Sequence, residues 1–331
     1  MNLMVNNYCN LHCPYCFAQE EMHSKKVMNI TIENYKIFLD FLKKNDMDSV
    51  RLIGGEPTLH PDLDKLIQEA INYQCFNNVV IFTNLTFSHE VAQMLVEKNK
   101  DIDILLLPNI NDLDMLLPNQ KEKIIANLDY LSQNLSHFDR ISINLYAPDQ
   151  DLKKWEEIIC RYNLKSIRWT IVAPNHEIKK DFDFYNYFHQ FQPLLLQMAE
   201  WRIKYGIEID SDCANFPVCC LDGSAISYIY RTQNDMLNKT PYCLNIVGDV
   251  SPDLTVRECF VSTGKDRKKL TDFDNYDQLD TYYHIQREER YKGKMARKQC
   301  IDCPIYKIYG HSCCCYGYQI LEEREGSHDR K

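Results

Sequence analysis

Short apolar segments alternate with longer amphipathic ones over residues 1–172, and this alternation constrains the fold more than any other feature of the chain. The apolar segments are rich in Val, Ile and Leu with little polar alternation, which is typical of strands covered on both faces. Strict alternation of strands and helices predicts a parallel sheet, curled or open, with right-handed crossovers. The predicted strands are residues 3–7, 50–53, 78–83, 104–107, 140–145 and 166–172.

The segments between these strands have the periodicity of helices. Apolar residues share one helical face after Thr31, a suitable N-cap, and a second helix starts near Pro61. Ligands of such folds bind beyond the carboxyl ends of the strands, so the loops after the strands are where a site is expected. Further helical segments are predicted at residues 88–98, 119–135, 151–162 and 178–205.

The charge and hydropathy of the chain argue against two kinds of partner. The net charge is −9, and the basic stretches 265–269 and 287–298 are short and mixed with acidic and aromatic residues. We interpret them as solvated helix faces rather than nucleic-acid patches. No segment approaches the roughly 18 apolar residues of a membrane span, and the N-terminus lacks a targeting pattern. We therefore expect a cytoplasmic protein without nucleic-acid or membrane partners.

Fifteen cysteines are unusual in a chain without a secretory signal. In a reducing compartment, clustered cysteines more often bind metal than form disulfides. Three of them lie at positions 9, 13 and 16, and ten lie from Cys213 onward. The two isolated ones, Cys75 and Cys160, are interpreted as small buried hydrophobes.

Cys9, Cys13 and Cys16 follow the first predicted strand directly, in the pattern C-x3-C-x2-C. A structural zinc site takes four ligands, usually as two pairs, and His12 is next to Cys13 and poorly placed to share its metal. Iron–sulfur clusters take Cys thiolates, normally four for a cubane. A cubane held by three cysteines leaves one iron open for a ligand that is not protein.

A second motif, GGEPTLHP, follows the second predicted strand at residues 54–61. Glycine lets a backbone approach a ligand closely, and a carboxylate can accept hydrogen bonds from an ammonium group. The third strand ends in FTNLT and the fifth reads ISINLYAPD. Thr83, Ser142 and Asn144 are therefore either further candidates for the same site or ordinary strand-end residues.

Over residues 1 to about 175, these motifs resemble those of the radical S-adenosylmethionine (radical SAM) enzymes. The resemblance implies an α/β fold with a partial (β/α)6 barrel over residues 1–205. It implies a [4Fe–4S] cluster on Cys9, Cys13 and Cys16, with S-adenosylmethionine bound to the fourth iron. Leu85 departs from the family, which usually has glycine there. The residues that match the family's cofactor contacts are Tyr15, Gly54, Gly55, Glu56, Pro57, Thr83, Ser142 and Asn144.

The resemblance also implies an activity. An electron enters the cluster and breaks the S–C5′ bond of S-adenosylmethionine, and the 5′-deoxyadenosyl radical removes a hydrogen atom from a substrate carbon. The chain would then be an enzyme of oxidoreductase or peptide-modifying type, supplied with electrons by a donor such as flavodoxin or ferredoxin.

The cysteine-rich stretch 206–318, before a polar tail at 319–331, resembles the α+β auxiliary-cluster regions of the same family, the SPASM and twitch domains. The segment between Cys243 and Cys259 reads as a hairpin, with Leu254 where glycine is usual. The resemblance implies at least one auxiliary [4Fe–4S] cluster. Its predicted ligands come from Cys243, Cys259, Cys300, Cys303, Cys313 and Cys315.

Three alternatives concern the remaining cysteines. A second auxiliary cluster would draw on Cys213, Cys219 and Cys220. A zinc site at Cys300 and Cys303 with two of the triplet Cys313, Cys314 and Cys315 is also chemically sound. Cys213 could instead donate a hydrogen atom near the substrate, as lone cysteines do in some radical epimerases.

The substrate has two candidate classes. A ribosomally made peptide, crosslinked, dehydrogenated or epimerised, is favoured by association with the auxiliary-cluster region. Against it, the chain starts only eight residues before Cys9, which leaves no room for an N-terminal leader-binding domain. A small molecule such as a sugar, cyclitol or nucleotide derivative is the alternative. A non-catalytic zinc- or cluster-binding scaffold would differ from both by having no affinity for S-adenosylmethionine.

Overall fold

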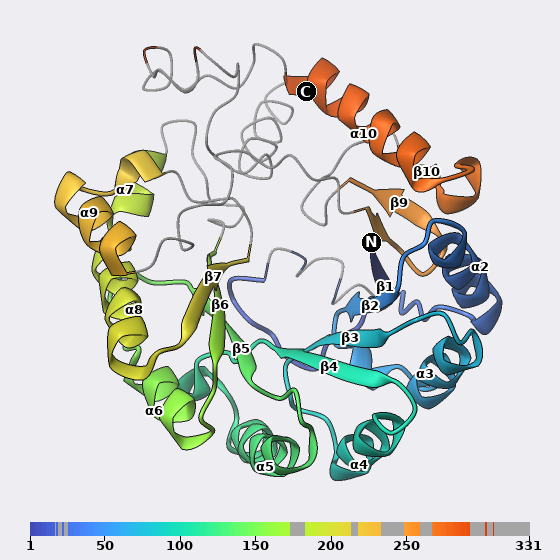
Figure 1. Cartoon of the computed structure of the whole chain (residues 1–331), viewed down its shortest axis with the longest axis horizontal. Helices are drawn as coiled ribbons and strands as arrows, with labels where there is room; N and C mark the ends of the chain where they lie inside the picture. Colours follow the sequence, from blue (N-terminus) through green and yellow to red (C-terminus); the bar gives the residue numbers. More distant parts are fainter. Residues whose placement is uncertain are drawn as a thin grey trace.

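The structure is a computed structural model of the whole chain (Figure 1). It describes residues 1–16, 18, 22, 26–172, 183–212, 218–232, 248–258, 267–291, 302 and 307.

Six parallel strands follow one another around an arc, and each predicted strand is confirmed (Figure 1). β1 to β4 are neighbours in one sheet, and β5 and β6 pair in another. The two sheets meet where the N–H of Ile110 donates a 3.1 Å hydrogen bond to the carbonyl of Ser142. The fold is thus α/β, with the parallel order that the sequence predicts. The strands are β1 (Asn2–Asn6), β2 (Ser49–Gly54), β3 (Asn78–Thr83), β4 (Asp103–Pro108), β5 (Arg140–Leu145) and β6 (Ser166–Ile171).

Helices cover the outer side of this arc (Figure 1). Thr31 is the N-cap of α2, as predicted, because its hydroxyl accepts a 3.2 Å hydrogen bond from the N–H of Asn34. Within the described residues, no helix is both long enough and apolar enough to span a bilayer. The helices are α2 (Ile32–Lys44), α3 (Leu63–Asn72), α4 (His89–Lys98), α5 (Pro118–Asn134), α6 (Lys153–Arg161), α7 (Phe184–His189), α8 (Gln192–Tyr205), α9 (Gly223–Thr232) and α10 (Tyr276–Tyr291).

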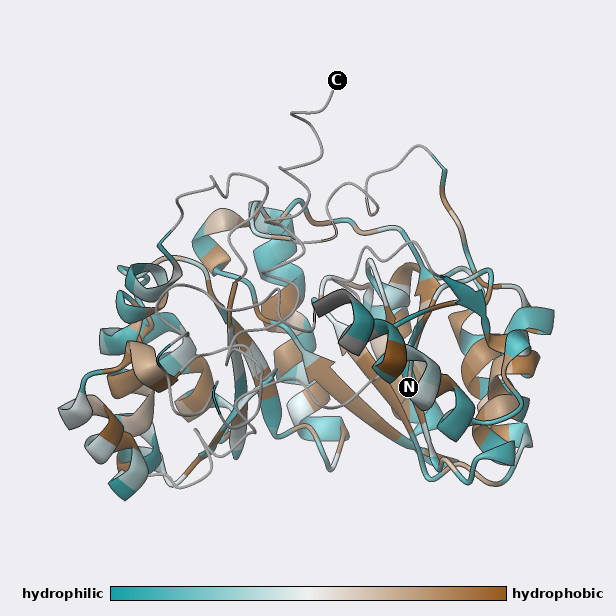
Figure 2. Ribbon diagram, turned by 90° about the horizontal axis from the view of Figure 1, so that it is seen from above, coloured by the Kyte–Doolittle hydropathy of each residue, from teal (hydrophilic) through white to brown (hydrophobic). Residues whose placement is uncertain are grey.

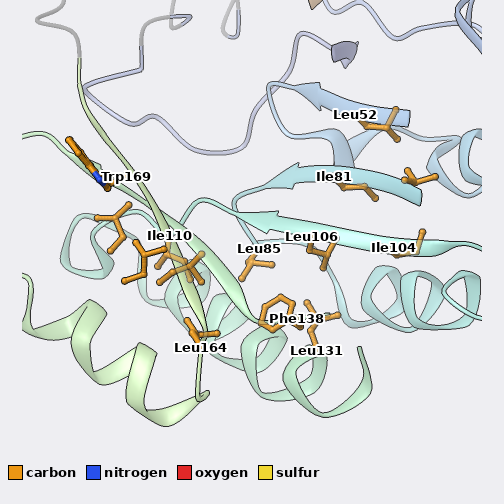
Figure 3. Packing of buried hydrophobic residues seen from close by; sticks show 14 of the residues in the cluster. Leu52, Ile81, Leu85, Ile104, Leu106, Ile110, Leu131, Phe138, Leu164 and Trp169 are labelled. Atoms are coloured by element: carbon orange, nitrogen blue, oxygen red, sulfur yellow. The ribbon is translucent and has the colours of Figure 1, made fainter. Parts of the chain in front are cut away.

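The core lies between the strands and these helices. Alternate strand residues such as Leu52, Ile81 and Leu106 are buried there (Figure 3). In Figure 2 the hydrophobic colour concentrates on the strands and on the helix sides that face them. The side of the strands opposite the helices, which we call the inner face, is less buried and more polar.

Strands from beyond residue 205 extend both edges of the arc. β7 (Glu208–Ser211) pairs with β6, and β8 (Asp249–Val250) pairs in parallel with β1. β9 (Thr255–Arg257) and β10 (Lys268–Lys269) continue the second edge in antiparallel order. The division of the chain at residue 205 stays a prediction, and strands pair across it.

Two buried leucines adopt the left-handed backbone conformation. Leu85 has φ of 60° and Leu254 has φ of 65°, and both stand where the family resemblance implies glycine. The predicted hairpin is confirmed by the antiparallel pairing of β8 and β9. Leu254 lies in the turn between these two strands, at a position that glycine commonly occupies. This conformation costs about 1–2 kcal/mol in an L-residue, and burial of both side chains offsets the cost.

Candidate functional site

The three N-terminal cysteines lie on the loop that leaves the carboxyl end of β1. Their side chains are half-buried, and the N–H of Cys16 donates a 3.0 Å hydrogen bond to the carbonyl of Cys13, which turns the loop back. The N–H of Leu11 and the side-chain amide of Asn84 both point at the sulfur of Cys9, at 3.4 and 3.8 Å. Such donors stabilise a thiolate at this position.

Burial disfavours the charged form of all three thiols. It raises the pKa of Cys9 to about 11 and the pKa of Cys13 to about 12, and it also raises the pKa of Cys16. For Cys13, the charges of the other two sulfurs add to the increase. Thiolates at this place therefore need a nearby positive charge, which bound iron ions would supply.

The described residues contain no group of three His, Cys, Asp or Glu side chains placed to hold a single metal ion. A cluster has a different requirement, because each iron of a cubane takes its own thiolate. The donor set of three soft sulfurs on one half-buried loop therefore fits a cluster better than a single ion.

The end of β2 lies directly against the cysteine loop. The N–H of Gly55 donates to the carbonyl of Asn6 at 3.1 Å, and the N–H of Glu56 donates to the carbonyl of Tyr8 at 2.7 Å. A Cβ atom on Gly55 would lie 2.0 Å from the Tyr8 oxygen, and one on Gly54 would lie 2.6 Å from the Asn6 side chain. These glycines are needed because two segments of the chain's own backbone touch here.

Glu56 joins the ends of β2 and β3. Its side chain is 1% exposed, and Oε1 accepts hydrogen bonds from the hydroxyl of Thr83 at 2.7 Å and from the hydroxyl and N–H of Thr58 at 2.6 and 3.2 Å. Oε2 accepts a 2.7 Å hydrogen bond from the N–H of Asn84. Burial raises the pKa of Glu56, while these hydrogen bonds favour the carboxylate. Oε2 keeps capacity for one more donor. Pro57 starts a short 3-10 turn, Pro57–Leu59, directly behind it.

Tyr15, on the cysteine loop, reaches the ends of β4 and β5. Its hydroxyl donates a 2.5 Å hydrogen bond to Asn111, and its ring stacks on Tyr146 with centroids 5.1 Å apart and planes inclined by 13°. The amide of Asn144 donates to Asn109 at 3.2 Å and interacts with Tyr15 as well. The hydroxyl of Tyr146 in turn donates a 2.6 Å hydrogen bond to Asp112.

The structure thus brings the predicted N-terminal site residues other than Ser142 to one end of the arc, whereas Ser142 lies within β5, three residues before its end. The residues that the sequence analysis missed follow strands β3, β4 and β5, but they have no spacing pattern of their own. A search for polar side chains within four residues of a strand end would have found them. They are Asn84, Asn109, Asn111, Asp112 and Tyr146.

The second-half cysteines are described only in part. Cys219 is exposed, and Cys220 is buried in a short 3-10 turn, Val218–Cys220. The other predicted ligands and the candidate hydrogen-atom donor lie outside the described residues: Cys213, Cys243, Cys259, Cys300, Cys303, Cys313, Cys314 and Cys315.

The interpretation of the isolated cysteines is wrong, since Cys75 and Cys160 are both exposed. Cys75 follows Gln74, whose φ of 55° turns the chain after α3, and Cys160 lies on the outer side of α6. Neither position faces the core.

A family model described as the Radical SAM superfamily matches residues 3–163. An uncharacterized protein of Methanocaldococcus jannaschii is 26% identical over 210 residues, which are 61% of this chain and 71% of that protein. The GTP 3′,8-cyclase of a Sulfurovum species is 29% identical over 141 residues, which are 42% of this chain and 41% of the cyclase.

Among solved structures, Streptococcus suis SuiB bound to S-adenosylmethionine matches with a TM-score of 0.63. The match covers 97% of this chain and 74% of SuiB at 15% identity, so it is a likeness of fold.

Proposed function

The chain belongs to the radical SAM superfamily, and on that premise we propose that it is an enzyme that modifies a ribosomally made peptide by radical chemistry. The observation that carries the proposal is the loop of three half-buried thiols laid against the glycine pair after β2, with the ends of β3, β4 and β5 around it. The alternative is the same chemistry on a small molecule such as a sugar, cyclitol or nucleotide derivative.

In this proposal Cys9, Cys13 and Cys16 hold a [4Fe–4S] cluster. When bound, the cluster supplies the electron that splits S-adenosylmethionine, and the radical so formed takes a hydrogen atom from the substrate. The donors on Leu11 and Asn84 stabilise the Cys9 thiolate against the cost of burial.

The surrounding residues position the cofactor. Oε2 of Glu56 has capacity for one further hydrogen bond, which suits an ammonium group, and Glu56 fixes the loop after β3 at the same time. Tyr15, held by Asn111 and Tyr146, forms an aromatic wall beside Asn144. This wall excludes water from one side of the site.

We further propose at least one auxiliary [4Fe–4S] cluster, with ligands among Cys243, Cys259, Cys300, Cys303 and Cys313–Cys315. The hairpin between β8 and β9 supports this, because it has the turn that the family's auxiliary region opens with, and Leu254 takes the glycine conformation. A zinc site on the last two groups is the alternative.

The two substrate classes draw support from different neighbours. A further structure of SuiB is bound to the precursor peptide SuiA, and the likeness of fold covers 96% of this chain. The cyclase of the Sulfurovum species is named for a nucleotide substrate, but the match covers 42% of this chain. We favour the peptide because the fold likeness reaches into the second half. An electron donor such as flavodoxin or ferredoxin would feed the cluster.

The test is iron and sulfide content together with S-adenosylmethionine cleavage, measured anaerobically. The wild type is compared with a Cys9/Cys13/Cys16→Ala variant and with a Cys75/Cys160→Ala control that removes exposed thiols. We expect the first variant to lose about four irons per chain and all cleavage, and the control to lose neither. About four remaining irons would support one auxiliary cluster, and none would overturn it. Unchanged cleavage in the first variant would overturn the proposed function.

A further inference from the structure

The inner face of the arc carries charged side chains that the proposed chemistry does not use. Val50 and Leu52 of β2 are buried in the core on the helix side, so Arg51 between them points to the inner face. By the same alternation Phe82 of β3 and Arg168 of β6 face inward, and both are half-buried.

These three residues form one cluster, which we call the Phe82 cluster: Arg51, Phe82 and Arg168. The guanidinium carbons of both arginines lie 5.4 Å from the centroid of the Phe82 ring. Arg51 comes from the sheet that contains β2 and β3, and Arg168 comes from the sheet that contains β5 to β7. The cluster therefore links the two sheets across the inner face.

The two arginines differ in how their charge is balanced. Arg168 forms an ion pair with Asp212, just after β7. Within the part of the chain that the structure describes, the side chain of Arg51 makes no hydrogen bond or ion pair, and its Nε is buried without an acceptor. Burial lowers the pKa of Arg51, and the carboxylate of Asp249 opposes this from a distance. The charge of Arg168 is thus balanced by a direct ion pair, whereas Arg51 is influenced by Asp249 without an ion pair to it.

A half-buried guanidinium without a partner is costly in a folded protein. The planar fork of arginine matches the two oxygens of a carboxylate, and the flanking Phe82 ring fixes its plane. Arg51 lies three residues before the end of β2, about 10 Å below the edge where the cofactor site lies. A substrate whose reacting carbon is at that edge could place another group at Arg51.

We propose that Arg51, held by Phe82 and flanked by Arg168, binds a carboxylate of the substrate. One carboxylate group of the substrate would supply the planar, two-oxygen partner that the guanidinium of Arg51 lacks, whereas the oxygens of a phosphate are arranged tetrahedrally. The inference deepens the proposed function and rests on it, since it takes the inner face as the substrate side. In a peptide, the group would be an acidic side chain or the terminal carboxylate.

The test uses glutarate as the probe and inorganic phosphate as the comparison, at constant ionic strength, on the full chain. Arg51→Met keeps the apolar stem and removes the guanidinium. Arg161→Met is the matched control, because Arg161 also lies over a ring, 5.2 Å from the centroid of Tyr162, but on the exposed surface and paired with Asp129.

With glutarate at about ten times its dissociation constant, we expect the thermal midpoint of the wild type and of Arg161→Met to rise by about 2–4 °C. Arg51→Met should not respond. Without probe, Arg51→Met should be as stable as the wild type or more so, because it removes an unpaired charge. These results together support the site.

Three results would overturn it. They are an equal glutarate response in Arg51→Met, no response in the wild type, and a response to phosphate in place of glutarate. Cleavage of S-adenosylmethionine by the wild type is measured in parallel. Intact cleavage without a glutarate response rejects the carboxylate site alone, whereas an Arg51-dependent response without cleavage rejects the proposed function alone.

Discussion

The backbone N–H of Asn84, after β3, donates a 2.7 Å hydrogen bond to Oε2 of Glu56, after β2. The same Asn84 directs its side-chain amide at the sulfur of Cys9. Asn84 therefore connects the buried carboxylate of Glu56 to the cysteine loop. Glu56 supports the structure of the site through this contact within the protein.

Glu56→Gln should destabilise the protein by about 1–3 kcal/mol, because every partner of the carboxylate is a donor and an amide nitrogen cannot accept from the N–H of Asn84. Glu97→Gln is the control, since Glu97 is an exposed partner of Lys100. Urea unfolding measures both. A loss for Glu56→Gln no larger than for the control would contradict this account.

Gly55→Ala should cost at least about 3 kcal/mol or displace the cysteine loop, because the new Cβ would lie 2.0 Å from the carbonyl oxygen of Tyr8. Gly223→Ala, where nothing lies within 4 Å of the added atom, should be neutral within about 0.5 kcal/mol or slightly stabilising. Unfolding free energies and the iron content after reconstitution check both variants. Equal stability of the two would refute the close contact.

At Leu85, the glycine variant should be more stable than the alanine variant, which is the reverse of the usual order. Both Leu85→Ala and Leu85→Gly remove a buried side chain, at about 2–5 kcal/mol. Since φ is 60°, the glycine variant should nevertheless be about 1 kcal/mol more stable than the alanine variant. At Leu106, a buried strand residue, alanine should be the more stable by about 0.5–1 kcal/mol. Chemical denaturation of the four variants decides; the same order at both positions would speak against a strained Leu85.

Asp112→Asn should be about 1–3 kcal/mol less stable than the wild type at pH 7. Burial alone would raise the pKa of Asp112, but hydrogen bonds from Tyr146, the N–H of Asp114 and Lys154 outweigh it and lower the pKa. The charged form therefore contributes stability above about pH 4, and this contribution is lost as the pH falls through the lowered pKa.

The difference between Asp112→Asn and the wild type should consequently shrink between about pH 5 and pH 3, as urea midpoints at several pH values would reveal. Asp101→Asn, at an exposed position, provides the comparison and should differ little from the wild type throughout. A difference for Asp112→Asn that does not change with pH would rule out the charge as its source.

The strands and most helices were predictable because their residues repeat at the period of the element they form. The apolar residues of 78–83 and 140–145 left few alternatives, and those strands match to the residue. The cysteine loop and Gly54–Pro57 were equally visible, since both follow strands in dense motifs. Periodicity and motif spacing are local properties, and local properties can be read from a sequence.

The rest of the site depends on contacts between distant segments. Tyr146 has no pattern that connects it to Tyr15, and the two rings meet only because β5 lies opposite the loop after β1. Leu85 could not be predicted as left-handed because leucine rarely adopts that conformation. The sequence motif predicted that the carboxylate of Glu56 contacts a ligand. It gave no sign that this carboxylate is buried and accepts hydrogen bonds from within the protein.

The pairing of β1 with β8 has a consequence for how the chain is made. Asn2 and Asp249, joined by a 2.8 Å hydrogen bond, are 247 residues apart, so one edge of β1 has no partner until β8 has been synthesised. At about 5–20 residues per second this takes roughly 10–50 s. An open strand edge can pair with other chains, so a nascent chain is exposed to aggregation at the strand that carries the cysteine loop. β1 is therefore synthesised early but acquires its second neighbouring strand late.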